Sequence, residues 1–250
     1  MPIDTQLGEP ARAFAPSPAQ RSFVIEALFP PGVAAAELRS GGDPALLAPD
    51  EAQALARAVP KRAREFAAGR LCARSALARF GIAGFALRAA PDRRPLWPEA
   101  VVGSITHTTG FCAAVVAERT RFASLGLDTE LAAAVKAELW PSICVADELG
   151  WIESLPQAER ARAATLIFCA KEAFYKCQYP CTEEWLGFQD VRIVALDWGR
   201  SQGAFAVEPQ RRLAWFTAPD APPRMLAAAY RFHEEFLSAG VALPMSARSA

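Results

Sequence analysis

The same order of predicted elements, a strand, a long helix and then further strands, occurs twice along this chain of 250 residues. In the first half, apolar residues three or four apart predict a helix over residues 61–80, between Pro60 and Gly81. In the second half, the same spacing predicts a helix over residues 157–177, with Pro180 beyond its end. We therefore expect an α+β fold of two similar lobes related by pseudo-twofold symmetry.

Strands are predicted where apolar residues alternate, or form short runs that end at turn residues. Residues 106–110 separate two such runs, so a hairpin is expected with His107 near its turn. A further helix is predicted over residues 131–140. The expected strands span residues 22–29, 101–105, 112–117, 125–130, 191–196, 203–207, 213–217 and 225–230.

The two lobes are expected to divide near residues 118–124. Both chain ends are rich in Pro, Ala and Ser and show no sustained period, which is typical of poorly ordered segments. The predicted organisation is a loose segment over 1–20, an N-terminal lobe over 21–120, a C-terminal lobe over 121–237 and a loose tail over 238–250.

Composition indicates an ordinary globular protein of the cytoplasm. Hydrophobic residues make up 52% of the chain and charged residues 22%, which is enough apolar material for a substantial core. The first residues include Asp4 and Glu9 and lack the features of a secretory signal, and no stretch resembles a membrane span. The six cysteines are then expected to be reduced thiols packed as small apolar groups.

The formal net charge is zero, which argues against a nucleic-acid partner or a membrane surface. The charges are nevertheless unevenly placed, since residues 57–94 hold ten Lys or Arg and two acids, whereas residues 128–159 hold seven acids and one lysine. A polyphosphate ligand with a bound cation would need such a pair of segments. Solvated helix faces explain most charge runs, and charge alone favours that plainer interpretation.

Two acidic motifs are more informative. Asp128 and Glu130 are two apart in a predicted strand, so both carboxylates point to one side of it. Glu172 and Lys176 are four apart in a predicted helix and share a face. Magnesium typically binds one or two carboxylates with water and substrate phosphate, so these acids suffice to hold one ion while the lysine meets phosphate charge. A solvated strand edge and a surface ion pair are the structural alternatives.

With its other motifs the chain resembles the 4′-phosphopantetheinyl transferases, and within them the group of enterobactin synthetase component D and its broad-range bacterial relatives. The resemblance spans residues 55–180, and several blocks in one order are more specific than any single block. The blocks are Lys61-Arg62-x-x-Glu65-Phe66-x-Ala68-Gly69-Arg70, Arg94-Pro95-x-Trp97-Pro98, Gly103-Ser104-Ile105-Thr106-His107, and Gly126-x-Asp128-x-Glu130 with Lys171-Glu172-Ala173-x-x-Lys176.

The resemblance implies an enzyme that moves the phosphopantetheine arm of coenzyme A onto a serine of an apo carrier protein and releases adenosine 3′,5′-bisphosphate. It implies magnesium as the cofactor, bound by Asp128, Glu130 and Glu172. It also implies contacts with coenzyme A from Lys61, Arg62, Arg70, Arg94, Thr106, His107 and Lys176, with Lys176 at the pyrophosphate.

Catalysis at a pyrophosphate must offset negative charge and remove the proton of the serine hydroxyl. Glu172 is expected to accept this proton, either directly or through a metal-bound water, while Lys176 stabilises or protonates the leaving phosphate. The acceptor stays open among acyl, peptidyl and aryl carriers of fatty-acid, peptide and siderophore biosynthesis. Because both lobes lie on one chain, we expect a monomer.

Two other classes of protein are weighed against this hypothesis. A non-catalytic module that binds a carrier protein or a nucleotide would be expected to have lost a metal carboxylate, and all three are present. A serine hydrolase could use Ser104, Asp128 and His107. However, Ser104 and His107 are three apart along one predicted strand and its turn, so they would face opposite sides, and the Gly-x-Ser-x-Gly motif is missing.

Overall fold

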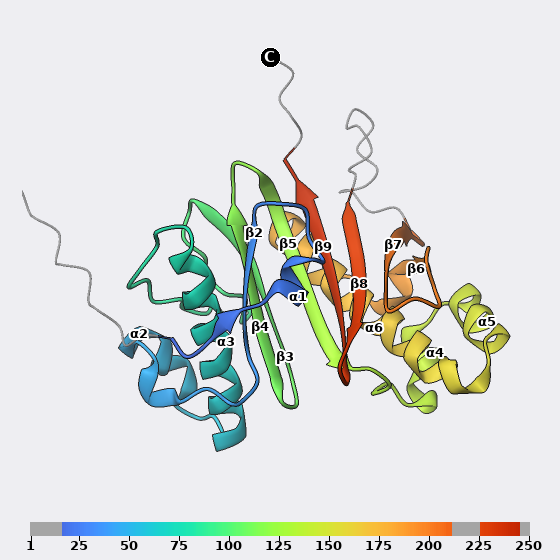
Figure 1. Cartoon of the computed structure of the whole chain (residues 1–250), viewed down its shortest axis with the longest axis horizontal. Helices are drawn as coiled ribbons and strands as arrows, with labels where there is room; N and C mark the ends of the chain where they lie inside the picture. Colours follow the sequence, from blue (N-terminus) through green and yellow to red (C-terminus); the bar gives the residue numbers. More distant parts are fainter. Residues whose placement is uncertain (1–16, 212–225, 246–250) are drawn as a thin grey trace, which may run out of the picture.

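The computed structural model describes residues 17–211 and 226–245. Two antiparallel sheets lie side by side, and each packs one long helix against a face (Figure 1). The strand order is β1-β2-β4-β3 in the N-terminal sheet and β5-β9-β8-β7-β6 in the C-terminal sheet. The α+β fold expected from the sequence is confirmed.

The elements of both sheets and their helices have the following bounds. The strands are β1 (Gln20–Arg21), β2 (Val33–Leu38), β3 (Val101–Thr108), β4 (Phe111–Glu118), β5 (Phe122–Leu131), β6 (Val191–Ala195), β7 (Gln202–Pro209), β8 (Ala227–His233) and β9 (Phe236–Pro244). The α-helices are α1 (Phe23–Glu26), α2 (Pro49–Ala52), α3 (Pro60–Ala78), α4 (Trp140–Ile143), α5 (Ala146–Ser154) and α6 (Gln157–Thr182). Short 3₁₀ turns occupy Pro44–Leu46, Gln53–Leu55, Ala137–Leu139 and Phe188–Asp190.

Helix α3 forms close to its predicted bounds and covers the N-terminal sheet. Proline is well tolerated at its first position because the backbone donor it lacks would have no helical partner there. The buried side of the helix includes Cys72 and Leu77, which join one apolar cluster with Val116 of β4. The predicted hairpin is also confirmed, because β3 and β4 pair antiparallel up to Thr108 and Phe111.

Helix α6 packs on β5 and β9 and forms the main core of the C-terminal lobe with them. The contact with β5 is so close that a side chain at Gly126 would overlap the backbone carbonyl of Ala173. The helix extends further than expected, because Pro180 lies inside its last turns instead of beyond its end. It ends at Glu183, which has a left-handed backbone (φ 54°) and donates its N–H to Tyr179.

The strand predicted over residues 22–29 was wrong, because α1 forms there. Ser22 caps this helix, since its hydroxyl accepts the backbone N–H of Ile25 at 3.2 Å. The first long strand is instead β2, whose three consecutive alanines give little strand signal in the sequence. Strand β2 joins the N-terminal sheet between β1 and β4.

The helix predicted over residues 131–140 was also wrong. Strand β5 continues to Leu131, which pairs with Phe236 of β9, and Ala132 donates its backbone N–H to Glu235. This extension of the sheet leaves room only for a turn and the 3₁₀ segment before α4 begins at Trp140.

The prediction of a loose tail over 238–250 was wrong for residues 238–244. They belong to β9, which lies between β5 and β8 in the C-terminal sheet. Its residues from Phe236 to Leu243 are buried, so the strand shows no alternation of apolar and polar residues that would reveal it. The chain end therefore completes the sheet that carries β5.

The remaining predicted strands are found as β6, β7 and β8, while the strand expected over 213–217 lies outside the described residues. Figure 1 shows α4 and α5 at the far end of the C-terminal lobe, beside β6. Within the described ranges, no helix is both long and apolar enough to cross a membrane.

Candidate active site

Three acidic side chains influence one another electrostatically where α6 packs on β5. Asp128 and Glu130 lie on β5, and Glu172 lies on α6. Burial, and then the Asp128 carboxylate, raise the pKa of Glu130 to about 7. Burial also raises the pKa of Glu172, with Lys176 opposing the shift and Asp128 adding to it. Two of the three acids that the sequence analysis proposed as metal ligands, Glu130 and Glu172, thus lie in a setting that disfavours their negative charges.

Asp128 is the most constrained of the three acids. It is only 5% exposed, and its Oδ1 accepts hydrogen bonds from Lys176 Nζ at 2.6 Å and from Thr106 Oγ1 at 3.3 Å. Its Oδ2 is buried without any hydrogen-bond partner among the described residues. A buried carboxylate oxygen without a partner is costly, so this atom has unused capacity for a donor or a cation.

Lys176 lies on α6 one turn after Glu172 and also donates to the backbone carbonyl of Leu127, at 3.3 Å. Burial opposes its charge, but the attraction and hydrogen bond of Asp128 outweigh burial and raise the pKa of Lys176 above its usual value. The ammonium therefore stays charged at neutral pH.

His107 and Arg62 form a second part of the site, on the N-terminal lobe. Arg62 Nη1 donates to His107 Nε2 at 2.9 Å, and because a guanidinium only donates, the imidazole proton lies on Nδ1. Burial, followed by the charge of Arg62, lowers the pKa of His107. Arg62 also lies 3.6 Å from Glu65, to which the mostly exposed Lys61 makes a long ion pair at 3.9 Å.

Arg70 lies inside the N-terminal lobe, not on the open face of α3. Its Nε donates to the backbone carbonyl of Leu87 at 3.1 Å, and its guanidinium stacks over Phe66 with 3.9 Å to the ring centre. Burial lowers the pKa of Arg70 to about 10. Its Nη2 is buried without a partner among the described residues, so Arg70 has both structural contacts and one unused donor group.

Arg94 connects the two lobes. Its Nη2 lies 2.9 Å from Glu183 at the end of α6, and its Nε lies 3.2 Å from Asp92 on its own loop. In the described part of the chain, its ion pairs are therefore with these two carboxylates and not with the acids of β5.

In the ranges 17–211 and 226–245, no group of three or more His, Cys, Asp or Glu side chains is arranged to hold a metal ion. Lys176 instead occupies one oxygen of Asp128. A serine hydrolase would need a hydrogen bond between its serine and its histidine. Instead, Ser104 is buried and accepts the backbone N–H of Leu127 at 3.0 Å, while His107 accepts a hydrogen bond from Arg62.

Sequence reasoning missed Thr108, whose hydroxyl donates to Glu130 Oε2 at 3.2 Å. The spacing could have predicted this residue, because Thr108 is two residues after Thr106 in a strand and so lies on the same side. By contrast, Lys171 of the last motif is buried against Glu148 with 2.7 Å between their charged atoms, and has a structural role.

A site with a buried aspartate, two half-buried glutamates, a charged lysine and basic side chains near the junction of two lobes is suited to binding a phosphate ester. Comparisons with known proteins are more specific. Residues 50–117 match the model of the 4′-phosphopantetheinyl transferase N-terminal domain, and residues 124–230 match the model of the 4′-phosphopantetheinyl transferase superfamily.

Curated relatives agree with both models. The chain is 39% identical over 170 residues to 4′-phosphopantetheinyl transferase Npt of Nocardia iowensis, covering 68% of this chain and 76% of that protein. It is 37% identical over 146 residues to 4′-phosphopantetheinyl transferase PptT of Mycobacterium tuberculosis, covering 58% and 63%. It is 31% identical over 187 residues to enterobactin synthase component D of Salmonella typhi, covering 69% and 74%.

The chain belongs to the 4′-phosphopantetheinyl transferase superfamily. The resemblance recognised in the sequence motifs is confirmed, and so is the function that it implied. That function is transfer of the phosphopantetheine arm of coenzyme A to a carrier protein.

Proposed function

We propose that this transfer depends on magnesium, held by Asp128, Glu130 and Glu172. The observation that carries the proposal is the buried, unpartnered Oδ2 of Asp128 beside two acids whose pKa values are raised by burial. A hard divalent cation prefers carboxylate oxygens and would favour the ionised form of all three groups. When bound, magnesium would supply positive charge to the pyrophosphate oxygens at which charge develops.

Glu172 and Lys176 have different roles in the proposed transfer. Glu172 lies beside Asp128 and Lys176, where its carboxylate can accept the proton of the serine hydroxyl of the carrier. Lys176 remains charged and is held beside Asp128, where it can stabilise the leaving phosphate. Both side chains come from one helix, and their spacing of four residues places them on one face.

The basic residues of the N-terminal lobe bind the phosphates of coenzyme A. His107 and Arg62 already contact one another and supply neighbouring donors, and Arg70 has a free buried Nη2. Lys61 adds an exposed ammonium on the same helix. Arg94 also belongs to the set implied by the sequence motifs. Thr106 belongs to it too, but it is 1% exposed and gives its hydroxyl proton to Asp128, so it would act on the ligand only through that carboxylate. For Arg94, the Glu183 carboxylate that lies 2.9 Å from Nη2 would compete with a phosphate for the guanidinium.

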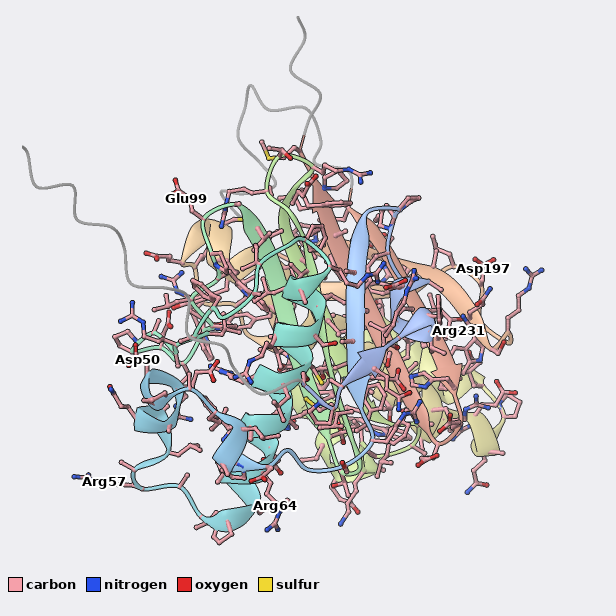
Figure 2. All side chains as sticks on the ribbon, turned by 60° about the vertical axis from the view of Figure 1, so that its left-hand side comes forward. Asp50, Arg57, Arg64, Glu99, Asp197 and Arg231 are labelled. Atoms are coloured by element: carbon pink, nitrogen blue, oxygen red, sulfur yellow. The ribbon has the colours of Figure 1, made fainter. Side chains whose placement is uncertain are left out.

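The acceptor is an apo acyl, peptidyl or aryl carrier protein, and the similarity to enterobactin synthase component D favours a carrier of siderophore assembly. Figure 2 shows Arg57 and Arg64 at one end of the N-terminal lobe with their side chains directed outward. An acidic carrier would be attracted to this end. Charge reversal at Arg57 would then raise the KM of the carrier and leave the KM of coenzyme A unchanged. We further propose that the enzyme acts as a cytoplasmic monomer.

The direct test is the intact mass of apo acyl and apo peptidyl carrier proteins after incubation with the enzyme, coenzyme A and magnesium. A gain equal to one phosphopantetheine arm is expected, and it should be lost when magnesium is chelated. The Asp128→Ala variant should give no gain at the same enzyme concentration. Transfer that continues unchanged in a chelator would contradict the magnesium dependence.

A further inference from the structure

Strands β3 and β5 are neighbouring strands that belong to different sheets. The backbone of β3 pairs with β4, and the backbone of β5 pairs with β9. Along β3, every second residue from 104 to 108 carries a hydroxyl, so Ser104, Thr106 and Thr108 lie on one side of the strand. We call these three residues the hydroxyl ladder.

The first two members of the hydroxyl ladder bind the backbone of β5. Ser104 Oγ accepts the N–H of Leu127 at 3.0 Å, and Thr106 Oγ1 accepts the N–H of Thr129 at 2.8 Å. Both hydroxyl residues are buried, with 5% and 1% of their surface exposed. Side chains of one lobe thus supply partners for backbone donors of the other lobe, which fixes how far β5 can slide along β3.

The last two members bind the carboxylates of β5. Thr106 has one hydroxyl proton, and it donates this proton to Asp128 Oδ1 at 3.3 Å while its lone pairs accept from the backbone. Thr108 donates to Glu130 Oε2 at 3.2 Å. Two acids of the C-terminal lobe are therefore oriented by two hydroxyls of the N-terminal lobe, with the same spacing of two residues on each strand.

We propose that Thr108 is a positioning residue of this enzyme, whose hydrogen bond holds the Glu130 carboxylate and would make the proposed magnesium site depend on the junction between the lobes. The inference rests on the proposed role of Glu130 as a magnesium ligand. Groups that orient metal ligands typically change metal affinity about 10-fold or more when removed. Thr108 suits a test better than Thr106, because it is only half buried and makes no backbone contact across the lobes.

The variants are Thr108→Val, which keeps the shape and removes the hydroxyl, and Thr108→Ser, which keeps the hydroxyl. Thr109→Val is the matched control, because Thr109 is the next residue and is exposed in the turn. Thr108→Ala is a second deletion of the hydroxyl in case the valine variant does not fold. For each protein, magnesium is titrated in the presence of coenzyme A and without carrier, and the melting temperature is recorded. The transfer rate is then measured against magnesium concentration with carrier present.

We expect Thr108→Val to need about 10-fold more magnesium for half of its thermal shift and for half of its maximal rate. At saturating magnesium its rate should return close to that of the wild type, and Thr108→Ser and Thr109→Val should titrate like the wild type. The proposal is overturned if Thr108→Val titrates like the wild type, or if Thr108→Ser is as defective as Thr108→Val. If the wild type itself shows no magnesium response while transfer proceeds, the magnesium proposal fails and this inference fails with it.

Discussion

Lys176 Nζ lies 2.6 Å from Asp128 Oδ1, so the lysine occupies one oxygen of the acid whose other oxygen is buried without a partner. The pair joins α6 to β5 at the centre of the candidate site. The exposed fraction of the lysine side chain is 29%, against 8% for the aspartate, so the lysine is the partner that can reach a ligand. The same ammonium can therefore balance the acid in the free enzyme and meet phosphate charge in the complex.

Replacing this lysine should impair the chemical step more than binding. Lys176→Met removes the cation that stabilises the leaving phosphate, and we expect kcat to fall by about 10²-fold or more. The KM of coenzyme A should change much less, because the phosphate contacts proposed for the other basic residues would remain. Initial rates of carrier modification by intact mass provide the measurement. Lys136→Met is the control, since Lys136 is exposed on the surface and should retain normal kcat. Normal turnover in Lys176→Met would remove the lysine from the mechanism.

Binding of coenzyme A should weaken as the pH rises. Burial and Arg62 lower the pKa of His107, so the free enzyme carries a neutral imidazole at pH 7. A phosphate dianion beside the imidazole favours the protonated form and raises its pKa in the complex. Because the pKa is then higher in the complex than in the free enzyme, binding takes up protons, and affinity is lost as the pH rises between the two values.

Calorimetry in buffers of different ionisation enthalpy would count the protons taken up when coenzyme A binds. His107→Gln should abolish that part of the uptake and flatten the pH dependence. His233→Gln is the matched control, because the pKa of His233 is also lowered by burial, yet its ring contacts Ser238 and lies beside Arg39. Equal proton uptake by the wild type and His107→Gln would show that the imidazole does not meet phosphate.

Position 126 should tolerate no side chain. In Gly126→Ala the new methyl would overlap the backbone of Ala173, so β5 and α6 must separate, at a cost of about 1–3 kcal/mol in the free energy of unfolding. The separation would also move Glu172 away from Asp128. Under the proposed magnesium dependence, the magnesium concentration needed for half of the maximal rate should therefore increase. Gly150→Ala in α5 is the control, because no other part of the described chain beyond its own helix backbone and chain neighbours lies within 4 Å of the added methyl, and it should stabilise the protein slightly. Denaturant unfolding of both variants measures the difference, and equal stabilities would contradict the close packing.

The sequence predicts the elements whose signals are local. Helices α3 and α6 have sustained helical spacing, and the β3–β4 hairpin has a clear turn, so all three were found, although α6 continues through Pro180 to Thr182, beyond its predicted end. Strand β9 was missed because it is buried along almost its whole length and lacks alternation. Helix α1 was mistaken for a strand because four residues are too few to show helical spacing, and the capping contact of Ser22 with Ile25 was not recognised.

The candidate site likewise has features that local sequence spacing predicts and features that it does not. The spacing within a strand and within a helix predicts which acids share a face, and in the structure the charges of Asp128, Glu130 and Glu172 influence one another. What spacing cannot predict is contact between distant segments. The ion pair of Arg94 with Glu183 spans 89 residues of sequence, and the interior position of Arg70 depends on the loop that contains Leu87.

The contact of Arg94 with Glu183 leads to a final prediction. If Arg94 binds a phosphate of coenzyme A, the Glu183 carboxylate competes with that phosphate in the free enzyme. Glu183→Gln should therefore lower the KM of coenzyme A. Ion pairs at exposed positions contribute about 1 kcal/mol or less, which limits the expected decrease to about 5-fold. The kcat should stay unchanged, and added salt should reduce the difference because it screens the competing charge.

Glu234→Gln is a closely matched control for this prediction. Glu234 is also exposed, also has a left-handed backbone (φ 51°, against 54° for Glu183), and also pairs with one arginine, Arg39, at 2.6 Å. Its removal should leave the KM of coenzyme A unchanged. In the double variant Arg94→Ala with Glu183→Gln, the benefit of removing the carboxylate should disappear, because no guanidinium remains to be released. If Glu183→Gln lowers KM equally with and without Arg94, the effect is one of general charge, and Arg94 is not the group for which phosphate and carboxylate compete.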